Sequence, residues 1–541
     1  MSAVMSTVRG PAIAELEAET AVQRATGSEI VTVASALLLL MVGEVLGSKP
    51  RILFERYFSV DEMWAKFLES DPSIWHSLVT LKHSPDQTPP LYHLVVRAFW
   101  CLWGGSPETA FRVPSFITIW IALVLTYTVL RRSFAVLPSL VAVLALWSYG
   151  PIVMYAFFAR PYALLLASTA GFCLIYGDDR TDGSWAVVTA GAAALVCSSH
   201  YFGIFGLASI VFVDVITRPA APSQKLTRLL PVTAGPIALL LILPFIRATT
   251  SGYPVSLSYL PPLTLSFAFQ EIVGGPIVGF LGSAIMLALI LELAWGASEL
   301  IRRSSYEKNP PAEPLRLSQP TILLSALLLV PLVLVLFSVV TDNYLLDRYM
   351  ITGLLGTTPL MAMIASRSSK RVLVYVLAFF TLVGALRVHG FGLQQEYWQL
   401  DRERLIRKVN ALNDRVPIVA YAKNEAYLIY SYAPLVRPRL FIADFSSSHM
   451  RDLSRGILVD GEIASRWSAA DPALPKLVNL NELRRMGDFH LIDASDVWVL
   501  AHPIGLSSDE RDAYTAKVLS LRRLAKTNTG GIDSLYEAEG N

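Results

Sequence analysis

Long apolar runs alternate with short polar segments along most of this chain. A helix needs about 20 predominantly apolar residues to cross the hydrocarbon core of a membrane. Eleven runs approach or exceed that length, so the sequence predicts an all-α polytopic membrane protein with about eleven transmembrane helices. The runs cover residues 29–46, 112–130, 133–151, 160–176, 185–201, 203–217, 229–246, 274–300, 320–340, 349–366 and 371–388.

A polar tail, residues 1–28, precedes the first apolar run. It carries three acidic residues, Glu15, Glu17 and Glu19, whereas a cleaved signal peptide begins with a basic region. We therefore expect the first run to be retained as a membrane anchor.

The distribution of basic residues predicts the orientation of the spans, because loops rich in Lys and Arg stay in the cytoplasm. The short turns on one side hold only Arg160, Arg247 and Arg348, each at or near the end of a run. With the N-terminus inside, thirteen basic residues fall in the inner loops: Arg131, Arg132, Arg180, Arg218, Lys225, Arg228, Arg302, Arg303, Lys308, Arg316, Arg367, Lys370 and Arg371. The chain is thus expected to begin in the cytoplasm and to end outside it.

The first outer loop, residues 47–111, contains two helix signals. Ser59 and Glu62 have the spacing of a capping box, and the apolar residues that follow fall on one helix face: Met63, Trp64, Phe67 and Leu68. A second apolar stretch, residues 91–103, follows two prolines and is short for a span. Both stretches are expected to form interfacial helices that lie along the membrane surface.

The last segment, residues 389–541, differs in composition from the spans. Short apolar stretches typical of buried strands occur at 416–422, 439–444, 490–493 and 497–501, and residues 509–526 have helical periodicity. The sequence therefore predicts three parts, with boundaries 1–28 for a cytoplasmic tail, 29–388 for the transmembrane domain and 389–541 for a small extracytoplasmic α/β domain.

The composition supports a membrane protein and gives no support for a nucleic acid as the partner. Of the 541 residues, 53% are hydrophobic and 16% are charged, against about 25% charged in soluble domains. The net charge of +2 gives no basic face for a nucleic acid. Cys101, Cys173 and Cys197 lie in apolar surroundings without ligand or disulfide spacing, so buried thiols are expected.

Asp61 and Glu62 are the most informative polar pair, because they follow the first span at the outer surface. A carboxylate beside an apolar, interfacial helix can act as a general base. The alternative is structural, since acidic residues in a first turn favour the helix dipole and the capping box alone accounts for Glu62. The residues by themselves leave both interpretations open.

The order of further motifs resembles the multi-spanning C-type (GT-C) glycosyltransferases, nearest to the group of protein O-mannosyltransferases and the lipid A aminoarabinose transferase. The resemblance covers about residues 30–390 and is most specific over 59–116. The motifs that carry it are Asp61-Glu62, Asp86-Gln87-Thr88-Pro89-Pro90-Leu91-Tyr92, Gly104-Gly105-Ser106-Pro107-Glu108, Phe111-Arg112-Val113-Pro114-Ser115, Arg160-Pro161-Tyr162, His200-Tyr201 and Asp347-Arg348-Tyr349.

This resemblance implies transfer of a sugar from a polyprenyl-phosphate carrier to an acceptor hydroxyl on the extracytoplasmic side of a bacterial inner membrane. The acceptor is a glycan, a lipid or a protein. The family's catalytic Asp-Glu pair carries over to Asp61 and Glu62, with Asp61 as the general base of a single, inverting displacement.

The resemblance also suggests residues for the substrates. Arg160 and Arg348 would hold the donor phosphate, although snorkelling to lipid headgroups, or pairing of Arg348 with Asp347, would equally explain them. His83 would add a phosphate contact or be a solvated loop histidine. The remaining candidates for substrate binding are Asp86, Tyr92, His200, Tyr201 and Tyr349.

A metal and two other functions stay open at this stage. Some C-type enzymes use a divalent cation, but the sequence has no HExxH, DxD or other close ligand set, so no cofactor is assigned. Many spans with charges at their edges are also typical of a transporter or flippase. An outer α/β domain is equally compatible with a non-catalytic assembly protein of the cell envelope.

Overall fold

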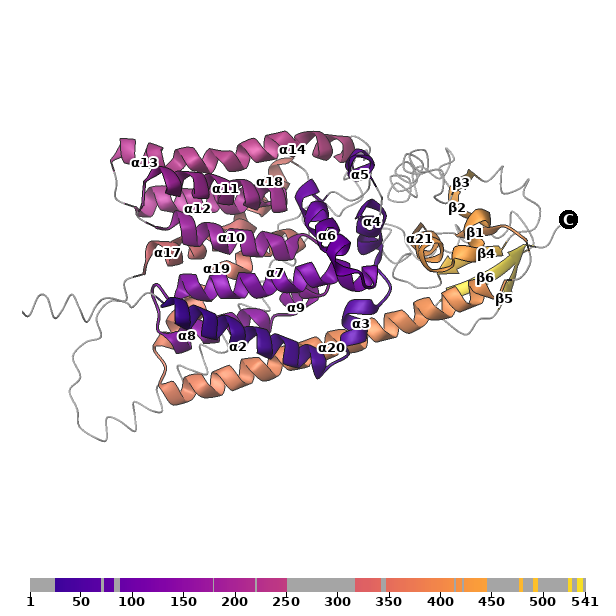
Figure 1. Ribbon diagram of the computed structural model, residues 1–541, viewed down its shortest axis with the longest axis horizontal. Coiled ribbons are helices and arrows are strands. Elements are labelled where there is room, and N and C mark those ends of the chain that lie inside the picture. Colours follow the sequence, from indigo (N-terminus) through magenta and orange to yellow (C-terminus); the bar gives the residue numbers. More distant parts are fainter. Residues whose placement is uncertain are drawn as a thin grey trace, which may run out of the picture.

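The computed structural model describes residues 25–69, 73–81, 88–178, 180–218, 221–250, 317–341, 347–412, 415–420, 423–444, 476–479, 490–494, 524–527 and 533–538. A bundle of roughly parallel and antiparallel helices fills one part of the molecule, and a small sheet lies beyond one end of it (Figure 1). Four short helices of the first outer loop lie at that same end. They are α3 (Pro50–Glu55), α4 (Val60–Glu69), α5 (Ile74–Leu81) and α6 (Pro90–Trp103).

Helices occupy every predicted apolar run that falls within the described residues. Within the described ranges, five helices are long and apolar enough to cross a membrane, and a sixth if the bent pair α8–α9 is one span. The predicted run 274–300 lies outside the described residues. The bundle is built from α2 (Gly27–Leu46), α7 (Pro107–Leu130), α8 (Val136–Trp147), α9 (Gly150–Ala156), α10 (Tyr162–Tyr176), α11 (Gly183–Ser199), α12 (Gly203–Thr217), α13 (Pro222–Leu229), α14 (Ala234–Thr250), α17 (Gln319–Ala326), α18 (Val330–Thr341), α19 (Thr352–Ser366) and α20 (Lys370–Asn410).

Helix α7 begins five residues earlier than the apolar run that predicts it. Ser106 is its N-cap and accepts a hydrogen bond from the Thr109 backbone N–H at 3.3 Å. Pro107 occupies the first turn, where its missing N–H costs nothing. Glu108 and Arg112 therefore lie inside α7, in its first two turns, rather than ahead of the span.

The predicted third span, residues 133–151, is broken into α8 and α9, which meet at an angle of 71°. The break falls at Ser148 and Tyr149, and α9 begins with Gly150 and Pro151, because a proline is compatible with the first turn of a helix but not with the interior of a continued α8. The change in direction sends the chain into the turn at residues 157–161, which carries Arg160.

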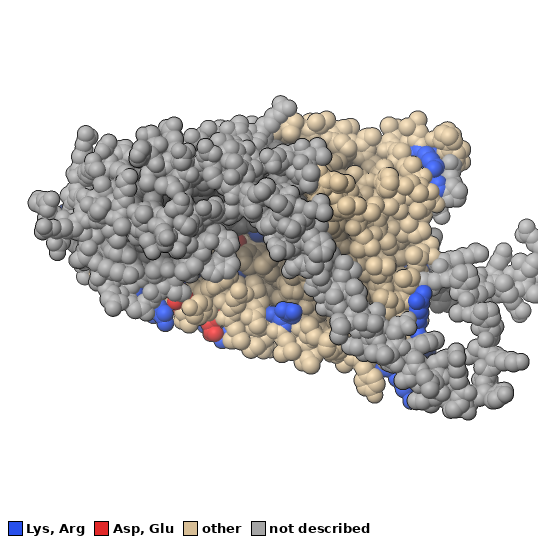
Figure 2. All heavy atoms as spheres, turned by 180° about the vertical axis from the view of Figure 1, so that it is seen from behind, with Lys and Arg blue, Asp and Glu red and all other residues tan. Residues whose placement is uncertain are grey.

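The described basic loops meet at one end of the bundle. Arg131, after α7, pairs with Glu29 in the first turn of α2 at 2.5 Å. Arg132 pairs with Asp178 after α10, and Arg228 of α13 donates to the Tyr176 carbonyl at 2.6 Å. Figure 2 shows Lys and Arg side chains along this edge of the bundle, at the right of the view. The loops that were predicted to be cytoplasmic thus share one face.

Helix α20 continues past the predicted domain boundary at residue 388 and reaches Asn410. At 1.5 Å per residue, its 41 residues extend about 60 Å, twice the thickness of a hydrocarbon core. Its last turns therefore project from the bundle toward the sheet (Figure 1). One rigid element joins the final span to the tail.

The tail contains a six-stranded sheet in the order β3-β2-β1-β4-β6-β5. Strands β3, β2, β1 and β4 run parallel, and β6 and β5 are antiparallel additions. The strands are β1 (Ile418–Ala420), β2 (Leu440–Asp444), β3 (Lys476–Asn479), β4 (His490–Ala494), β5 (Leu524–Thr527) and β6 (Asp533–Ala538). Helix α21 (Lys423–Tyr432) follows β1.

Two expectations, one about the tail and one about the thiols, require correction, and a third is not tested. The helix predicted for residues 509–526 is wrong at its end, because residues 524–526 belong to β5, whose pairing with β6 overrides the helical periodicity. The strand predicted at 497–501 lies outside the described residues. Cys101 is exposed on α6, so the expectation of a buried thiol holds only for Cys173 and Cys197.

Two residues of the apolar face of α4 pack against protein. Met63 and Leu68 are 2% and 1% exposed. They belong to a hydrophobic cluster that also contains Val96 of α6, Phe111 of α7 and Tyr427 of α21. The first outer loop and the tail therefore share one core.

Candidate active site at the outer end of the bundle

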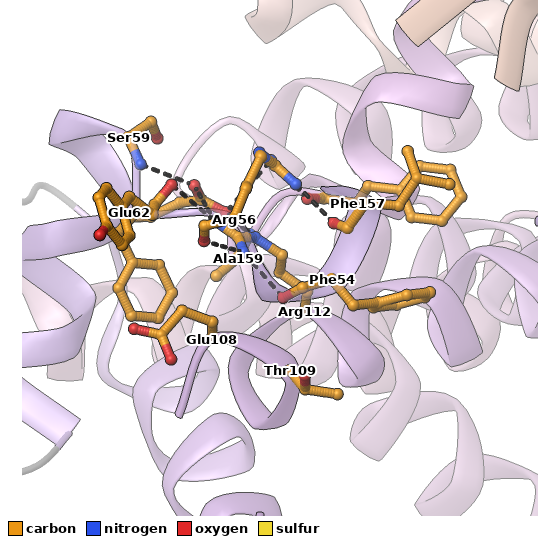
Figure 3. A network of polar contacts seen from close by, with 12 residues as sticks. Phe54, Arg56, Ser59, Glu62, Glu108, Thr109, Arg112, Phe157 and Ala159 are labelled. Atoms are coloured by element: carbon orange, nitrogen blue, oxygen red, sulfur yellow. Dashed lines mark hydrogen bonds and ion pairs between the residues drawn. The ribbon is translucent and has the colours of Figure 1, made fainter. Parts of the chain in front are cut away.

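Glu62, in the first turn of α4, is the centre of a buried polar network (Figure 3). Its carboxylate accepts hydrogen bonds from Arg112 Nε at 2.8 Å and Arg112 Nη2 at 2.9 Å. It also accepts from the backbone N–H groups of Ser59, at 2.9 Å, and Ala159, at 3.0 Å. A carboxylate has about four lone-pair positions, so these four bonds saturate it.

The sequence-predicted capping box is half formed. The Glu62 carboxylate binds the Ser59 backbone N–H, as the box requires. The Ser59 hydroxyl, which would complete it, makes no hydrogen bond among the described residues. Glu62 turns instead toward Arg112, fifty residues away along the chain.

All three guanidinium nitrogens of Arg112 donate hydrogen bonds. Beyond the two bonds to Glu62, its Nη1 donates to the carbonyls of Phe54 at 2.9 Å and Arg56 at 2.8 Å, and its Nη2 to the Tyr57 carbonyl at 3.4 Å. Five N–H donors in a rigid plane are specific to arginine. One side chain of α7 thereby fixes the segment between α3 and α4.

Arg56 connects this segment to the turn between α9 and α10. Its side chain is 1% exposed and donates to the Phe157 carbonyl at 2.9 Å. Its guanidinium carbon lies 4.9 Å from the centre of the Phe158 ring, and its Nη2 lies 3.7 Å from Glu62. The first outer loop and the 157–161 turn are thus held as one unit.

The charges of the network fix the protonation state of Glu62. Burial alone raises the pKa of its carboxyl, but the charges of Arg112 and Arg56 and the hydrogen bonds from Arg112 and Ser59 outweigh it, so the pKa lies well below its usual value. Glu62 is therefore an anion that partly compensates two buried cations. A group with this environment positions its neighbours and has no free lone pair with which to take a proton.

Two of the predicted site residues are sequence neighbours of Glu62 or of a residue that it binds. Asp61 directly precedes Glu62 in the first turn of α4, and the structure describes its backbone. Arg160 follows Ala159, whose N–H is bound by Glu62. One carboxylate thus links the turn that contains the predicted base to the turn that contains a predicted phosphate ligand.

Tyr92 of α6 lies in the same region and is 3% exposed. Burial and the charge of Glu69 raise the pKa of its phenol well above the usual value, whereas Arg160 opposes this shift. Next to it, His93 Nδ1 lies 2.9 Å from Glu69 Oε1 in a buried pair that joins α6 to the end of α4. The phenol is neutral and lies among groups of both charges.

The other predicted substrate residues meet in an aromatic cluster. The His200 ring lies 5.2 Å from that of Tyr162, 6.2 Å from Tyr201 and 6.0 Å from Tyr349, between ring centres. Its Nδ1 accepts the Phe202 backbone N–H at 3.2 Å. Tyr162 follows Arg160 by two residues, and Tyr349 directly follows Arg348 in the 3-10 helix Asp347–Met350. The motifs that carry both predicted phosphate ligands therefore converge on His200.

Not every predicted residue can be placed. His83 and Asp86 lie outside the described residues, and Arg348 is described by its backbone. In the ranges that the structure describes, no three His, Cys, Asp or Glu side chains are close enough to share a metal ion. A metal ligand set that includes His83 or Asp86 therefore stays a prediction.

Sequence reasoning missed several residues that build this site. Arg56, Glu69 and His93 have no motif of their own, and their roles depend on partners 24 or more positions away. Tyr432 and Lys66, described below, join the outer tail to the site in the same way.

A bundle of membrane helices with several short helices and a mixed domain at one end is the GT-C fold. The particular proteins to which this chain is similar are two solved structures of ArnT, a lipid A aminoarabinose transferase, from Cupriavidus metallidurans. One is bound to undecaprenyl phosphate and the other is in the apo state, with TM-scores of 0.56 and 0.55. Both are 12% identical, and each match covers 95% of this chain and 98% of the other.

These structural matches confirm the predicted fold class. The sequence itself matches no protein-family model and no curated protein. The similarity is therefore one of architecture, and the chemistry has to be argued from the residues of this chain.

Proposed function

We propose that this protein is an integral-membrane glycosyltransferase that transfers a sugar from a polyprenyl-phosphate donor to an acceptor hydroxyl on the extracytoplasmic side. One observation carries the proposal. The Glu62 network joins the turn that bears Asp61 to the turn that bears Arg160. It does so at the outer end of a bundle with the fold of ArnT, which has been solved with undecaprenyl phosphate.

The donor phosphate is assigned to Arg160 and Arg348. A phosphate held by two guanidinium groups gains charge-assisted, bidentate hydrogen bonds. The convergence of their motifs on His200 supports a common ligand. Tyr162, Tyr201 and Tyr349 offer aromatic faces and hydroxyl groups beside it, suited to a sugar or to the first units of a polyprenyl chain.

The reaction is a single displacement. The acceptor oxygen attacks the anomeric carbon of the donor sugar, the bond from that carbon to the phosphate oxygen breaks, and polyprenyl phosphate leaves with the electron pair. Asp61 takes the proton of the acceptor hydroxyl. Because attack and departure occur on opposite faces, the anomeric configuration inverts.

Glu62 serves this reaction as a positioning residue rather than as a second base. Its four lone-pair positions are occupied by two Arg112 nitrogens and two backbone N–H groups. The cations needed for the leaving phosphate are supplied by arginine, so the reaction does not require a general acid.

The positions of the charges support the proposed orientation. The described basic loops gather at the end of the bundle opposite the Glu62 network, and basic loops face the cytoplasm. We place the site on the outer side of a bacterial inner membrane, where the acceptor is a glycan, a lipid or a protein.

The decisive experiment measures release of free polyprenyl phosphate by the purified protein. A panel of undecaprenyl-phosphate sugars is offered with crude envelope extract as the acceptor source, to wild-type protein and to Asp61→Asn. Release by the wild type that the variant loses supports both the donor class and the base. Release that persists in the variant moves the base elsewhere, and no release from any donor contradicts the proposed function.

A further inference from the structure

The hydroxyl of Tyr432, at the end of α21 in the outer tail, bridges two elements of the site. It donates to Glu108 Oε1 at 2.9 Å, in the first turn of α7. It also accepts the backbone N–H of Phe58 at 3.0 Å, two residues before α4 begins. Both bonds join residues more than 300 positions apart in the sequence.

The Tyr432 ring also makes close contacts with neighbouring side chains. It stacks on Tyr57 with 4.0 Å between ring centres and an interplanar angle of 23°. On α4, Lys66 Nζ lies 4.6 Å from the centre of the Tyr432 ring and 3.9 Å from Glu108. Burial and the nearby Glu108 charge raise the pKa of the Tyr432 phenol, so it stays protonated and able to donate.

These contacts involve the same segment that the Glu62 network holds. Arg112 binds the Tyr57 carbonyl, Glu62 binds the Ser59 N–H, and Tyr432 binds the Phe58 N–H between them. Glu108 precedes Arg112 by one turn of α7. Tyr432 of the tail and the Glu62–Arg112 pair therefore bind three consecutive residues, 57–59, which only Val60 separates from Asp61.

We propose that Tyr432 is a positioning residue through which the outer tail fixes the turn that carries Asp61. The proposal rests on the function proposed above and assigns the tail a role in it. Without the two hydrogen bonds, the Phe58 N–H loses its partner, while Tyr57 stays bound to Gln399 and Arg402 of α20. A displacement of Asp61 by a fraction of an ångström then slows proton transfer while the donor site around His200 is untouched.

The test compares Tyr432→Phe with Tyr397→Phe in the full-length protein. Tyr432→Phe keeps the ring and its stacking on Tyr57 but removes both hydrogen bonds. Tyr397, on α20, is 58% exposed and supplies a control for loss of a phenolic hydroxyl. Two quantities are measured, namely hydrogen exchange of the peptide that covers residues 54–62, and kcat and KM for the donor.

For Tyr432→Phe we expect backbone exchange in residues 54–62 to become about five- to tenfold faster, as the loss of one ordinary hydrogen bond implies. We expect kcat to fall about tenfold or more with donor KM within about twofold of wild type. Tyr397→Phe should change neither. Unchanged exchange, or a loss expressed mainly in KM, would overturn the proposal.

A double variant distinguishes a shared positioning role of Tyr432 and Glu108 from general destabilisation of the protein. If Tyr432 and Glu108 act as one unit, then Tyr432→Phe/Glu108→Ala should lose little more kcat than the worse single variant, whereas independent damage multiplies. Multiplicative losses would contradict the proposal. Hydrogen exchange needs no substrate, so the positioning role can fail or succeed even if no donor is turned over, which separates it from the proposed function.

Discussion

Arg112 binds both carboxylate oxygens of Glu62, at 2.8 and 2.9 Å, and both side chains are fully buried. This pair joins the second span to the first outer loop. It thereby attaches α4, the helix that contains the predicted catalytic residue, to the transmembrane domain. Buried pairs of this kind are costly to assemble but far more costly to break, because removal of one partner leaves the other charge buried and unpaired.

Glu62→Gln should destabilise the protein by about 3–5 kcal/mol, since it leaves Arg112 and Arg56 without an anion. Thermal or denaturant unfolding in detergent measures the effect. Glu55→Gln on neighbouring α3 is the matched control, because Glu55 is 55% exposed and pairs with the exposed Arg51 at 4.0 Å. That variant should stay within about 0.5 kcal/mol of wild type. Similar losses in both variants would contradict a special role for Glu62.

The difference between wild type and Glu62→Gln should also depend on pH. The pKa of Glu62 is lowered in the folded state, so its stabilising contribution is complete above the unfolded value of about 4.3 and declines as the pH falls toward the folded value. At pH 3 the unfolded chain binds a proton that folded Glu62 does not, which reduces the difference by about 2 kcal/mol relative to pH 7. Unfolding of both proteins at the two pH values tests this. A difference independent of pH would mean that Glu62 is neutral in the fold.

The spans could be predicted from the sequence because apolar length is a local property. Residues 162–176 and 352–366, for example, are helical where the runs indicate. Local sequence signals changed the bounds of other spans. Ser106 caps α7 ahead of its apolar run, and Gly150 and Pro151 begin a new helix, α9, within another run. At residues 524–526 the helical periodicity failed because pairing with β6, an interaction outside the segment, decided the structure.

The site was predictable only in outline. The Asp61-Glu62 pair and Arg160 stood out by their motifs and proved to be neighbours through Ala159. The two carboxylates look alike in sequence, and only the position of Arg112 reveals that Glu62 is saturated. Tyr432 carries no motif, because its partners are 324 and 374 residues away.

Asp61→Asn should separate chemistry from stability. Loss of a general base costs about 100- to 10,000-fold in rate, so we expect kcat for sugar transfer to fall in that range while the melting temperature stays within about 2 °C of wild type. Glu62→Gln should lose stability and activity together. Measuring both quantities for both variants distinguishes them, and an Asp61→Asn protein that is equally unstable would assign Asp61 to the fold.

Arg160→Met should weaken binding of the product, undecaprenyl phosphate. A charged hydrogen bond contributes about 1.5–3 kcal/mol, which corresponds to about 10- to 150-fold in Kd. Titration of the protein in nanodiscs with the lipid phosphate measures it. Arg51→Met is the control, because the Arg51 side chain is 91% exposed on α3. Equal binding by the two variants would show that Arg160 contacts lipid headgroups or protein instead.

Helix α5 should contact the outer leaflet of the membrane. Trp75 is 76% exposed, and Ile74 and Val79 beside it are 41% and 55% exposed. Tryptophan favours the interfacial region of a bilayer.

We therefore expect lipids brominated near the headgroup to quench Trp75 more strongly than lipids brominated near the chain end. In Trp75→Phe the quenched share of fluorescence should fall, whereas Trp185→Phe, which removes a tryptophan that is 4% exposed, should leave that share no smaller. If Trp75→Phe quenches like the wild type, then α5 faces water or a protein partner, and the outer loop is anchored to the membrane by its flanking spans alone.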